Sequence, residues 1–173
     1  MKIERVVVGP LQENCSVISI DNKCLVIDPG DEFEKIKNII KDKEVLGILV
    51  THNHFDHVGA LNEVKDYYNS KVYDFSDLEE KEYNIGPFIF EVIYNPGHTM
   101  DSISFYFKEV NVIFVGDFIF LNSIGRCDLE GGNYLMMEES IDKIKHYSDD
   151  IIIYPGHGSD TTLGYEKKHN SFF

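Results

Sequence analysis

Short apolar runs rich in β-branched residues dominate the first part of the chain and predict strands separated by tight turns. The first three are IERVVV (3–8), CSVISI (15–20) and CLVIDPG (24–30), and the DNK between the last two is typical of a hairpin turn. DEFEKIKNIIK (31–41) then opens with acidic residues and repeats its apolar residues at helical spacing. We therefore expect a helix after the hairpin.

Strands and helices continue to alternate along the rest of the chain. Further strands are expected at 45–50, 70–75, 102–107, 111–117 and 150–157, and in the second half of 80–98 after a polar stretch. Further helices are expected at 58–68, 137–147 and 162–169. The turn-rich segment 119–135 predicts a long loop. With no repeat or linker composition, we expect one α/β domain over residues 1–173.

Composition and charge narrow the classes of function. The chain has 173 residues, 43% of them hydrophobic, and a formal net charge of -14. That charge disfavours nucleic-acid binding, which needs a cationic face. Three cysteines without CxxC spacing offer neither a disulfide framework nor a thiolate zinc site. Since no signal-like or membrane-spanning apolar run occurs, we expect a soluble cytoplasmic protein, whose oligomeric state the sequence leaves open.

Residues that bind metals gather at the ends of the predicted strands. THNHFDH places three histidines and an aspartate at 52–57, directly after the strand at 45–50. In an extended segment His52 and His54 point the same way, while Asp56 and His57 follow as the chain turns into a helix and aim differently. One strand end can therefore serve two neighbouring metal positions.

Three later strands end in the same way. Two finish in Pro-Gly-His, which gives His98 and His157, and one finishes in Gly-Asp, which gives Asp117. Proline stops the hydrogen-bond ladder and glycine allows a sharp turn, so the next side chain projects from the strand end. The seven nitrogen and oxygen donors suffice for two divalent ions bridged by a carboxylate. Because no cysteine is among them, we expect zinc first, with iron or manganese as alternatives.

These motifs resemble those of the metallo-β-lactamase-fold hydrolases. Within that fold the chain is most similar to short, single-domain, glyoxalase II-like (hydroxyacylglutathione hydrolase-like) proteins of bacteria. The likeness runs through QENCSVI, VIDPGD, THNHFDHVGA, NPGHTMDSISF, FVGDFIF, SIGRCDLEGG and YPGHGSDTTLGYEKKHN. The glyoxalase II-like part rests mainly on SIGRCDLEGG and TTLGYE.

The resemblance implies a fold and a set of ligands. The fold is an αββα sandwich of two mixed β-sheets flanked by helices, with the site at one sheet edge. One metal is then held by His52, His54 and His98. The other is held by Asp56, His57 and His157, and Asp117 bridges the two.

The resemblance also implies a reaction, the hydrolysis of a thioester such as S-lactoylglutathione. A pair of ions lowers the pKa of water toward about 7, which makes a metal-bridging hydroxide available as nucleophile. Asp56 and Asp117 are then the catalytic carboxylates, and a small acyl-thiol is the partner. We expect Arg126 to grip a substrate carboxylate, although its pairing with Asp128 to order the loop has comparable weight.

Some residues depart from the family pattern. Met100 and Asp101 replace a small or turn-forming pair, and Phe118 replaces the usual threonine after the bridging aspartate. The chain ends soon after His157, so we expect no C-terminal helical domain for glutathione. Asn14 and Asp28 also match family positions, but turn formation and sheet-edge capping explain these residues more readily. We expect the Cys127 side chain only to pack against its neighbours.

Three alternatives remain open. The first is a hydrolase of lactones or phosphoesters on the same centre. The second is a mononuclear iron sulfur (persulfide) dioxygenase that uses only ligands of the His52, His98 and Asp117 type. The third is a noncatalytic metal-binding domain, which the retention of every ligand disfavours.

Overall fold

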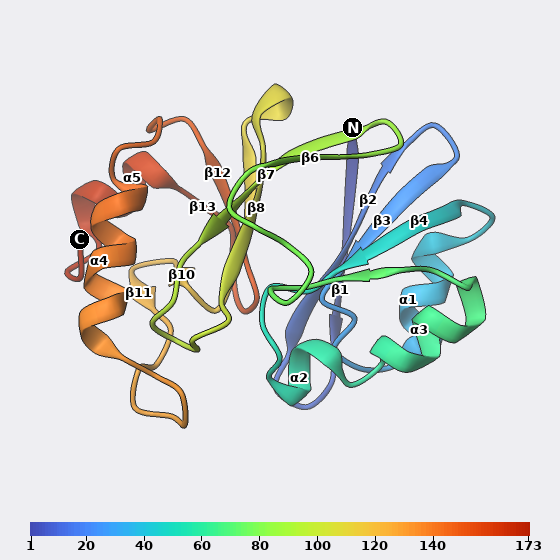
Figure 1. The fold of residues 1–173 in the computed structure, drawn as a ribbon, viewed down its shortest axis with the longest axis horizontal. Helices are drawn as coiled ribbons and strands as arrows, with labels where there is room; N and C mark the ends of the chain where they lie inside the picture. The colour runs from blue at the N-terminus through green and yellow to red at the C-terminus, as the bar shows by residue number, and fades with distance from the viewer.

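The computed structural model describes residues 1–173 and contains two β-sheets with helices on their outer sides (Figure 1). The first sheet has five strands in the order β1-β2-β3-β4-β5. Their bounds are Lys2–Val8, Glu13–Ile20, Lys23–Ile27, Glu44–Leu49 and Val72–Tyr73. Its β1-β2 and β2-β3 pairs are antiparallel, whereas β3-β4 and β4-β5 are parallel.

The second sheet has six strands in the order β13-β12-β9-β8-β7-β6. Strands β6 to β9 span Glu82–Ile85, Phe88–Tyr94, Ile103–Phe107 and Val112–Gly116, and β12 and β13 span Ile152–Pro155 and Thr161–Thr162. Only β12-β9 is parallel. A separate small hairpin joins β10 (Ile119–Phe120) to β11 (Ser123–Ile124).

Helices cover both outer faces of the pair of sheets. Helices α1 (Phe33–Ile40) and α3 (Leu61–Tyr68) lie on the first sheet, at the right of Figure 1. Helices α4 (Tyr134–Ile144) and α5 (Leu163–His169) lie on the second, at the left. The short α2 (Phe55–Val58) follows β4, and a 3-10 turn occupies Lys108–Val110. The expected αββα sandwich of two mixed sheets is confirmed.

Three hydrophobic clusters hold the four layers together. Side chains of both sheets interdigitate in the central cluster, which includes Ile18, Leu25, Leu49, Phe90, Phe105 and Phe114. Each outer cluster joins one sheet to its helices, through residues such as Val17, Ile36 and Val64 on one side and Ile113, Met137 and Ile141 on the other. Successive residues such as Val17 and Ile18 therefore point to opposite cores. A strand covered on both faces reads as a continuous apolar run, which is the pattern in the sequence.

Two expectations about local structure were wrong, and a third was right except for the start of its helix. The expected loop 119–135 contains β10 and β11, and α4 begins at Tyr134 because the Asn133 side chain caps it by accepting a hydrogen bond from the Met136 amide at 3.2 Å. The helix expected at 58–68 is present as α3 but begins only at Leu61, after Gly59, which lies against Gly30 so closely that a Cβ would come within 2.2 Å of its carbonyl oxygen. The polar stretch before β7 is itself strand β6.

No helix of the structure has the length and apolar character needed to cross a membrane. The three cysteines are free thiols: Cys15 and Cys24 are buried in the first outer cluster, and Cys127 is half-buried against the second.

Candidate metal centre

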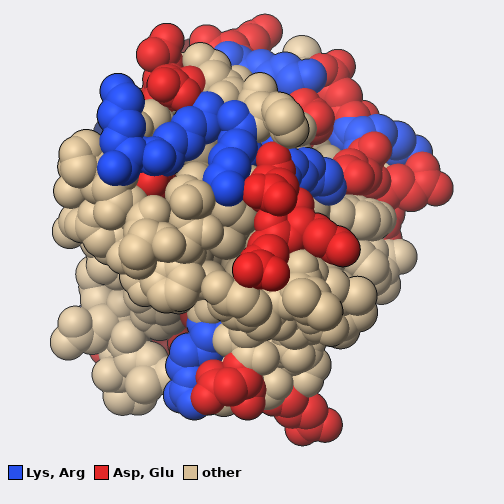
Figure 2. Space-filling view, turned by 90° about the vertical axis from the view of Figure 1, so that its left-hand side faces the viewer, with Lys and Arg blue, Asp and Glu red and all other residues tan.

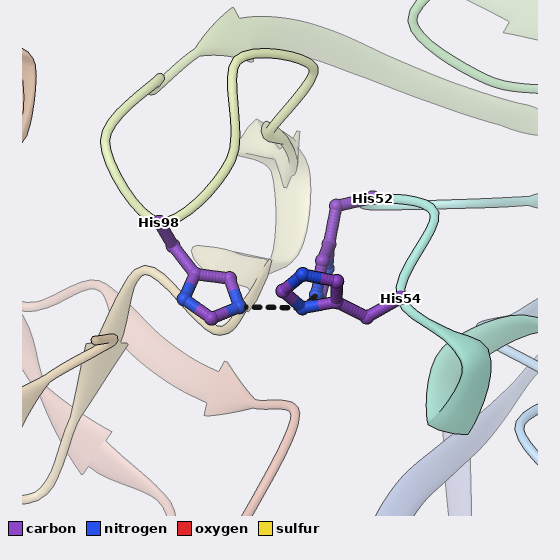
Figure 3. Close-up of side chains that lie close together, drawn as sticks. All are labelled: His52, His54 and His98. Atoms are coloured by element: carbon purple, nitrogen blue, oxygen red, sulfur yellow. Dashed lines mark hydrogen bonds between the residues drawn. The ribbon is translucent and has the colours of Figure 1, made fainter. Parts of the chain in front are cut away.

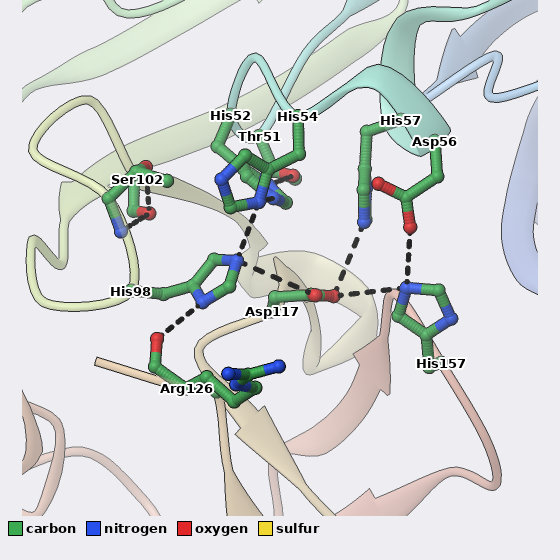
Figure 4. A network of polar contacts seen from close by, with 12 residues as sticks. Thr51, His52, His54, Asp56, His57, His98, Ser102, Asp117, Arg126 and His157 are labelled. Atoms are coloured by element: carbon green, nitrogen blue, oxygen red, sulfur yellow. Dashed lines mark hydrogen bonds and ion pairs between the residues drawn. The ribbon is translucent and has the colours of Figure 1, made fainter. Parts of the chain in front are cut away.

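The chain segments that carry the seven predicted ligands meet at one edge of the two sheets (Figure 4). His52 and His54 follow β4, and Asp56 and His57 lie on α2. His98, Asp117 and His157 follow β7, β9 and β12. Segments more than 100 residues apart in the sequence, such as those of His52 and His157, therefore contribute to one site.

Two glycines let the strand ends come this close. Gly116, just before Asp117, has a φ of +53°, and a Cβ there would lie 2.3 Å from the Thr51 hydroxyl. Gly156, just before His157, would place a Cβ 2.5 Å from a carboxylate oxygen of Asp117. The glycine in each strand-end motif thus removes a side chain from the floor of the site, in addition to allowing the turn.

The first group of ligands is His52, His54 and His98, drawn alone in Figure 3. Nδ1 of His54 lies 3.2 Å from Nε2 of His52 and 2.8 Å from Nε2 of His98. Three nitrogens bound tetrahedrally about 2.0–2.1 Å from zinc lie roughly 3.3 Å from one another. The observed spacing is close to that, so a single ion fits between the three rings.

The second group is Asp56, His57 and His157, whose ligand atoms also lie within 4.8 Å of one another. Nε2 of His157 is 3.2 Å from an oxygen of Asp56. Asp117 lies between the two groups, 3.6 Å from Nε2 of His98 on one side and 3.3 Å from Nε2 of His57 on the other. Its two oxygens face different groups, which is the arrangement that a bridging ligand requires.

Hydrogen bonds on the outer side of four rings decide which nitrogen faces inward. Nδ1 of His98 donates to the carbonyl of Arg126 at 2.7 Å, and Nδ1 of His157 donates to the carbonyl of Leu11 at 3.0 Å. A carbonyl only accepts, so the hydrogen of each neutral ring is on Nδ1 and Nε2 presents a lone pair. Both lone pairs point into the site.

The two remaining rings are held through Asp28. Its carboxylate accepts from Nδ1 of His57 at 3.0 Å and from the Thr51 hydroxyl at 2.6 Å. The Thr51 oxygen in turn accepts from Nδ1 of His52 at 3.1 Å. Nε2 of His52 and of His57 therefore also faces inward, and partners on the outer nitrogen of this kind orient metal-binding histidines generally.

The inward-facing atoms do not satisfy one another. Nε2 of His57 and one carboxylate oxygen of Asp117 are buried and make no well-aligned hydrogen bond. Lone pairs that converge in a buried space repel each other unless a cation lies among them. The donor set therefore fits divalent metal ions, and its imidazole and carboxylate composition suits zinc, iron and manganese.

Burial and neighbouring charges shift the pKa values of these side chains in different directions. Burial, followed by the like charge of neighbouring imidazoles, lowers the pKa of His52 well below its usual value. For Asp117, burial opposes the charged form, but the proximity of His57, His157 and His98 outweighs it, and the pKa is lowered. For His57, burial opposes the charged form, but Asp117 and Asp28 together hold the pKa well above its usual value. Metal ions compete with protons at such donors.

Comparison with known proteins decides the family. The model of the Metallo-beta-lactamase superfamily matches residues 8–73 and 68–157. The chain belongs to the metallo-beta-lactamase superfamily. Hydroxyacylglutathione hydrolase GloC of Haemophilus influenzae is 35% identical over 99% of this chain and 98% of its own.

Two solved structures are similar to this member of the superfamily over nearly its whole length. One is BLEG-1, a B3 metallo-beta-lactamase, with a TM-score of 0.95 and 32% identity over 99% of both chains. The other is TTHA1623 in a di-iron-bound form, with a TM-score of 0.90 and 32% identity over 98% of this chain and 100% of that one. The superfamily makes the chain a metallo-hydrolase and implies divalent metal ions at the His and Asp groups.

Asp28 and Asn14 were expected only to form turns or cap a sheet edge, but both contact the segments that carry the predicted ligands. Asp28 does more than cap a sheet edge, because it holds His57 directly and His52 through Thr51. Asn14 donates from its side chain to the carbonyls of Pro155 and Gly158, at 3.1 and 3.0 Å, and so fixes the turn that carries His157. Both positions support the ligands in place.

Sequence reasoning missed Glu13 altogether. Its side chain is 1% exposed, and neither carboxylate oxygen has a hydrogen-bond partner. It belongs to a buried group with Asp28 and His57, and burial raises its pKa well above the usual value. A glutamate at a strand start carries no local signal of this kind, so only the QENCSVI resemblance pointed to the region.

Arg126 lines the cavity of the site, but its guanidinium is already paired. Both oxygens of Asp128 accept from it, each at 2.9 Å, and the two side chains are exposed. This is the loop-ordering pairing expected as the alternative role. Cys127 packs against the outer cluster between the second sheet and its helices, and Phe118 is buried in that cluster. Asp101 accepts from Asn53 at 2.7 Å, and its neighbour Met100 is exposed.

One open cavity of about 810 Å³ lies over the ligands. Its wall includes His54, Asp56, His98, Asp117 and His157 together with Arg126 and Glu130. Its apolar lining residues are Leu11, Phe55, Phe120, Ile124 and Leu129. The volume lies within the range of about 300–1,000 Å³ typical of small-molecule sites, and the ligands of both groups border the same space.

Proposed function

We propose that this metallo-hydrolase is a dinuclear thioesterase that cleaves small S-acyl-thiols such as S-lactoylglutathione. The observation that carries the proposal is that two members of each group of three, His54 and His98 in one and Asp56 and His157 in the other, line one cavity with Asp117 between the groups. The relative named hydroxyacylglutathione hydrolase, 35% identical over almost the full length of both chains, supports the thioester as the substrate class.

We assign the first ion to His52, His54 and His98 and the second to Asp56, His57 and His157, with Asp117 reaching both. Zinc is the first choice for this donor set, and the di-iron form of a similar structure supports iron as an alternative to it. When bound, such ions lower the pKa of water toward about 7 and act as Lewis acids toward a carbonyl oxygen.

The protein's own residues orient the reactants. Asp56 and Asp117 present carboxylate oxygens to the cavity, where they accept a hydrogen bond from the attacking water and fix its direction toward the substrate carbonyl. The outer hydrogen bonds of the histidines hold the inward nitrogens in place while this occurs. Arg126 at the wall can exchange Asp128 for a substrate carboxylate, since a water-exposed ion pair contributes little stability.

The test combines metal analysis with a substrate panel on the purified full-length protein. Elemental mass spectrometry counts the ions per chain, and hydrolysis is followed for S-lactoylglutathione, a neutral thioester, a lactone, a phosphodiester and a β-lactam. We expect two ions per chain and the largest kcat/KM with a thioester. A higher kcat/KM for the lactone, the phosphodiester or the β-lactam would contradict the substrate class while keeping the hydrolase.

One result would contradict the reaction class itself. A single iron per chain, together with oxygen uptake in the presence of glutathione persulfide, would identify a sulfur dioxygenase that uses His52, His98 and Asp117. Oxygen-electrode measurements on the same preparation distinguish that result from hydrolysis.

A further inference from the structure

Large hydrophobic side chains remain exposed around the mouth of the cavity. Phe55 is 71% exposed, Leu11 51% and Leu129 38%, and all three line the cavity. They come from the β1-β2 turn, the start of α2 and the loop before α4, three segments far apart in the sequence. We call these three residues the apolar rim. Exposed apolar surface gathered at a site from separate segments marks ligand binding.

We infer that the substrate's acyl arm is an apolar chain that lies against this apolar rim. The inference rests on the proposed thioesterase function and specifies the acyl group. A lactoyl group has one methyl and one hydroxyl, so it leaves most of the rim in water. An acyl chain of several methylene groups covers it and gains the hydrophobic free energy of that contact.

The charges near the rim support an uncharged arm. Arg126 is the one cationic residue that lines the cavity, and Asp128 holds its guanidinium from two sides. Glu130 adds a negative charge to the same wall. An acyl arm that ended in a carboxylate would therefore meet repulsion at Glu130 and would compete for Arg126 with Asp128 and with the carboxylates of the thiol arm.

Most of the cations on the neighbouring α4 and α5 face are already paired with acids. In Figure 2 Lys and Arg side chains lie beside Asp and Glu over the upper part and again at the lower edge, an acidic group reaches down to the centre, and uncharged side chains fill much of the surface between them. The ion pairs of these helices are Lys143–Glu80, Lys145–Asp142 and Lys167–Asp149, whereas the exposed Lys168 of α5 has no acidic partner. A substrate that extended from the cavity toward this face would again find mainly uncharged surface.

The first test is a series of acyl-glutathione thioesters, from acetyl to octanoyl, with the metal-loaded protein. Since the thiol stays the same, only the acyl arm changes. We expect kcat/KM to rise about three- to fourfold for each methylene group that the rim covers. Phe55→Ala and Leu129→Ala should flatten the dependence on chain length, whereas Leu135→Ala, at a leucine outside the cavity that is about as exposed as Phe55, should preserve it.

The second test needs no hydrolysis. Calorimetry compares binding of S-hexylglutathione and S-methylglutathione, two thioethers that the enzyme cannot cleave. We expect the hexyl compound to bind at least about tenfold more tightly, and Phe55→Ala to remove most of the difference. Equal affinities, with S-lactoylglutathione still hydrolysed, would overturn the inference and leave the proposed function standing.

Two further outcomes are distinguishable. A clear preference for the hexyl compound without hydrolysis of any thioester would overturn the proposed function, and the apolar rim would then serve another substrate. If the rate does not depend on chain length and sedimentation shows a dimer that Phe55→Ala dissociates, the rim is a contact between two copies of the chain. That result would overturn the inference.

Discussion

At the scale of single residues, the outer nitrogen of each imidazole determines what the inner nitrogen can bind. His98 and His157 donate to backbone carbonyls, which no substitution removes. His52 and His57 depend instead on the side chains of Thr51 and Asp28. The effect of mutation on ligand orientation should therefore concentrate at Asp28, which serves both rings.

We predict that Asp28→Asn weakens binding of the second ion about 10- to 100-fold, the usual cost of losing such a partner. Asp28 accepts from the Thr51 amide, the Thr51 hydroxyl and Nδ1 of His57, and an asparagine would turn its NH2 toward one of these donors. Competition with a chelator of known affinity measures the change. Asp21→Asn, in an exposed turn, is the matched control, and equal affinities in both variants would exclude the role of Asp28.

Removal of a ligand from the second group should leave the first group intact. We expect Asp56→Ala and His157→Ala each to reduce bound metal from two ions toward one and to lose most hydrolase activity, because His52, His54 and His98 still form a complete site. Elemental analysis and single-substrate kinetics measure both effects. His146→Ala removes a histidine outside the site as a control, and unchanged turnover in the two ligand variants would contradict the assignment.

Arg126 allows a substrate-binding role to be separated from loop ordering. If the guanidinium binds a substrate carboxylate, Arg126→Ala should raise KM for acyl-glutathione several-fold more than it lowers kcat. Asp128→Ala should then leave KM unchanged or lower it, because it frees the guanidinium. If Arg126 only orders the loop, both variants should raise KM alike, and steady-state kinetics distinguishes the two patterns.

At the scale of elements, strand ends were easier to predict from the sequence than the structure between them. The apolar runs at the strands that end at Leu49, Gly116 and Pro155 predicted those strands. Each strand is followed by a histidine or aspartate of a metal-binding type that the structure brings to the site. The hairpin of β10 and β11 was missed because two-residue strands have no measurable period. Glu13 was missed because its burial depends on distant segments, which the sequence does not place.

The turn after β9 gives a prediction about backbone geometry. Gly116→Ala should lower the melting temperature and weaken metal binding, because a Cβ there meets the Thr51 hydroxyl at 2.3 Å and the φ of +53° disfavours any side chain. Gly131 has a φ of +80°, but a Cβ there would meet no atom within 4 Å. Gly131→Ala should therefore lower stability only through the unfavourable backbone conformation. Thermal scans and metal titrations of the two variants separate the steric effect at Gly116 from the conformational cost of a positive φ. Equal losses of melting temperature and metal affinity in both variants would show that crowding at Thr51 is unimportant.

At the scale of the whole molecule, the site connects the two sheets at an edge that the central hydrophobic cluster does not reach. The central cluster packs the sheets face to face, but the ligands lie at one edge, with four of them beside the first sheet and three after strands of the second. Bound cations would therefore cross-link β4 and α2 to the ends of β7, β9 and β12. Convergent lone pairs and buried carboxylates at the same edge favour opening it when no cation compensates them.

Metal removal should therefore affect global stability as well as activity. A ligand that binds only the folded state stabilises it by about 4 kcal/mol at a free concentration 1,000 times its Kd. We expect chelation to lower the melting temperature by about 10 °C or more and re-addition of zinc to restore it, with amide exchange rising first around residues 52–57 and 98. Calorimetry and hydrogen exchange measure the two effects. A melting temperature that does not respond to chelation, in protein shown by elemental analysis to have held metal, would mean that the site's edge is stable on its own packing.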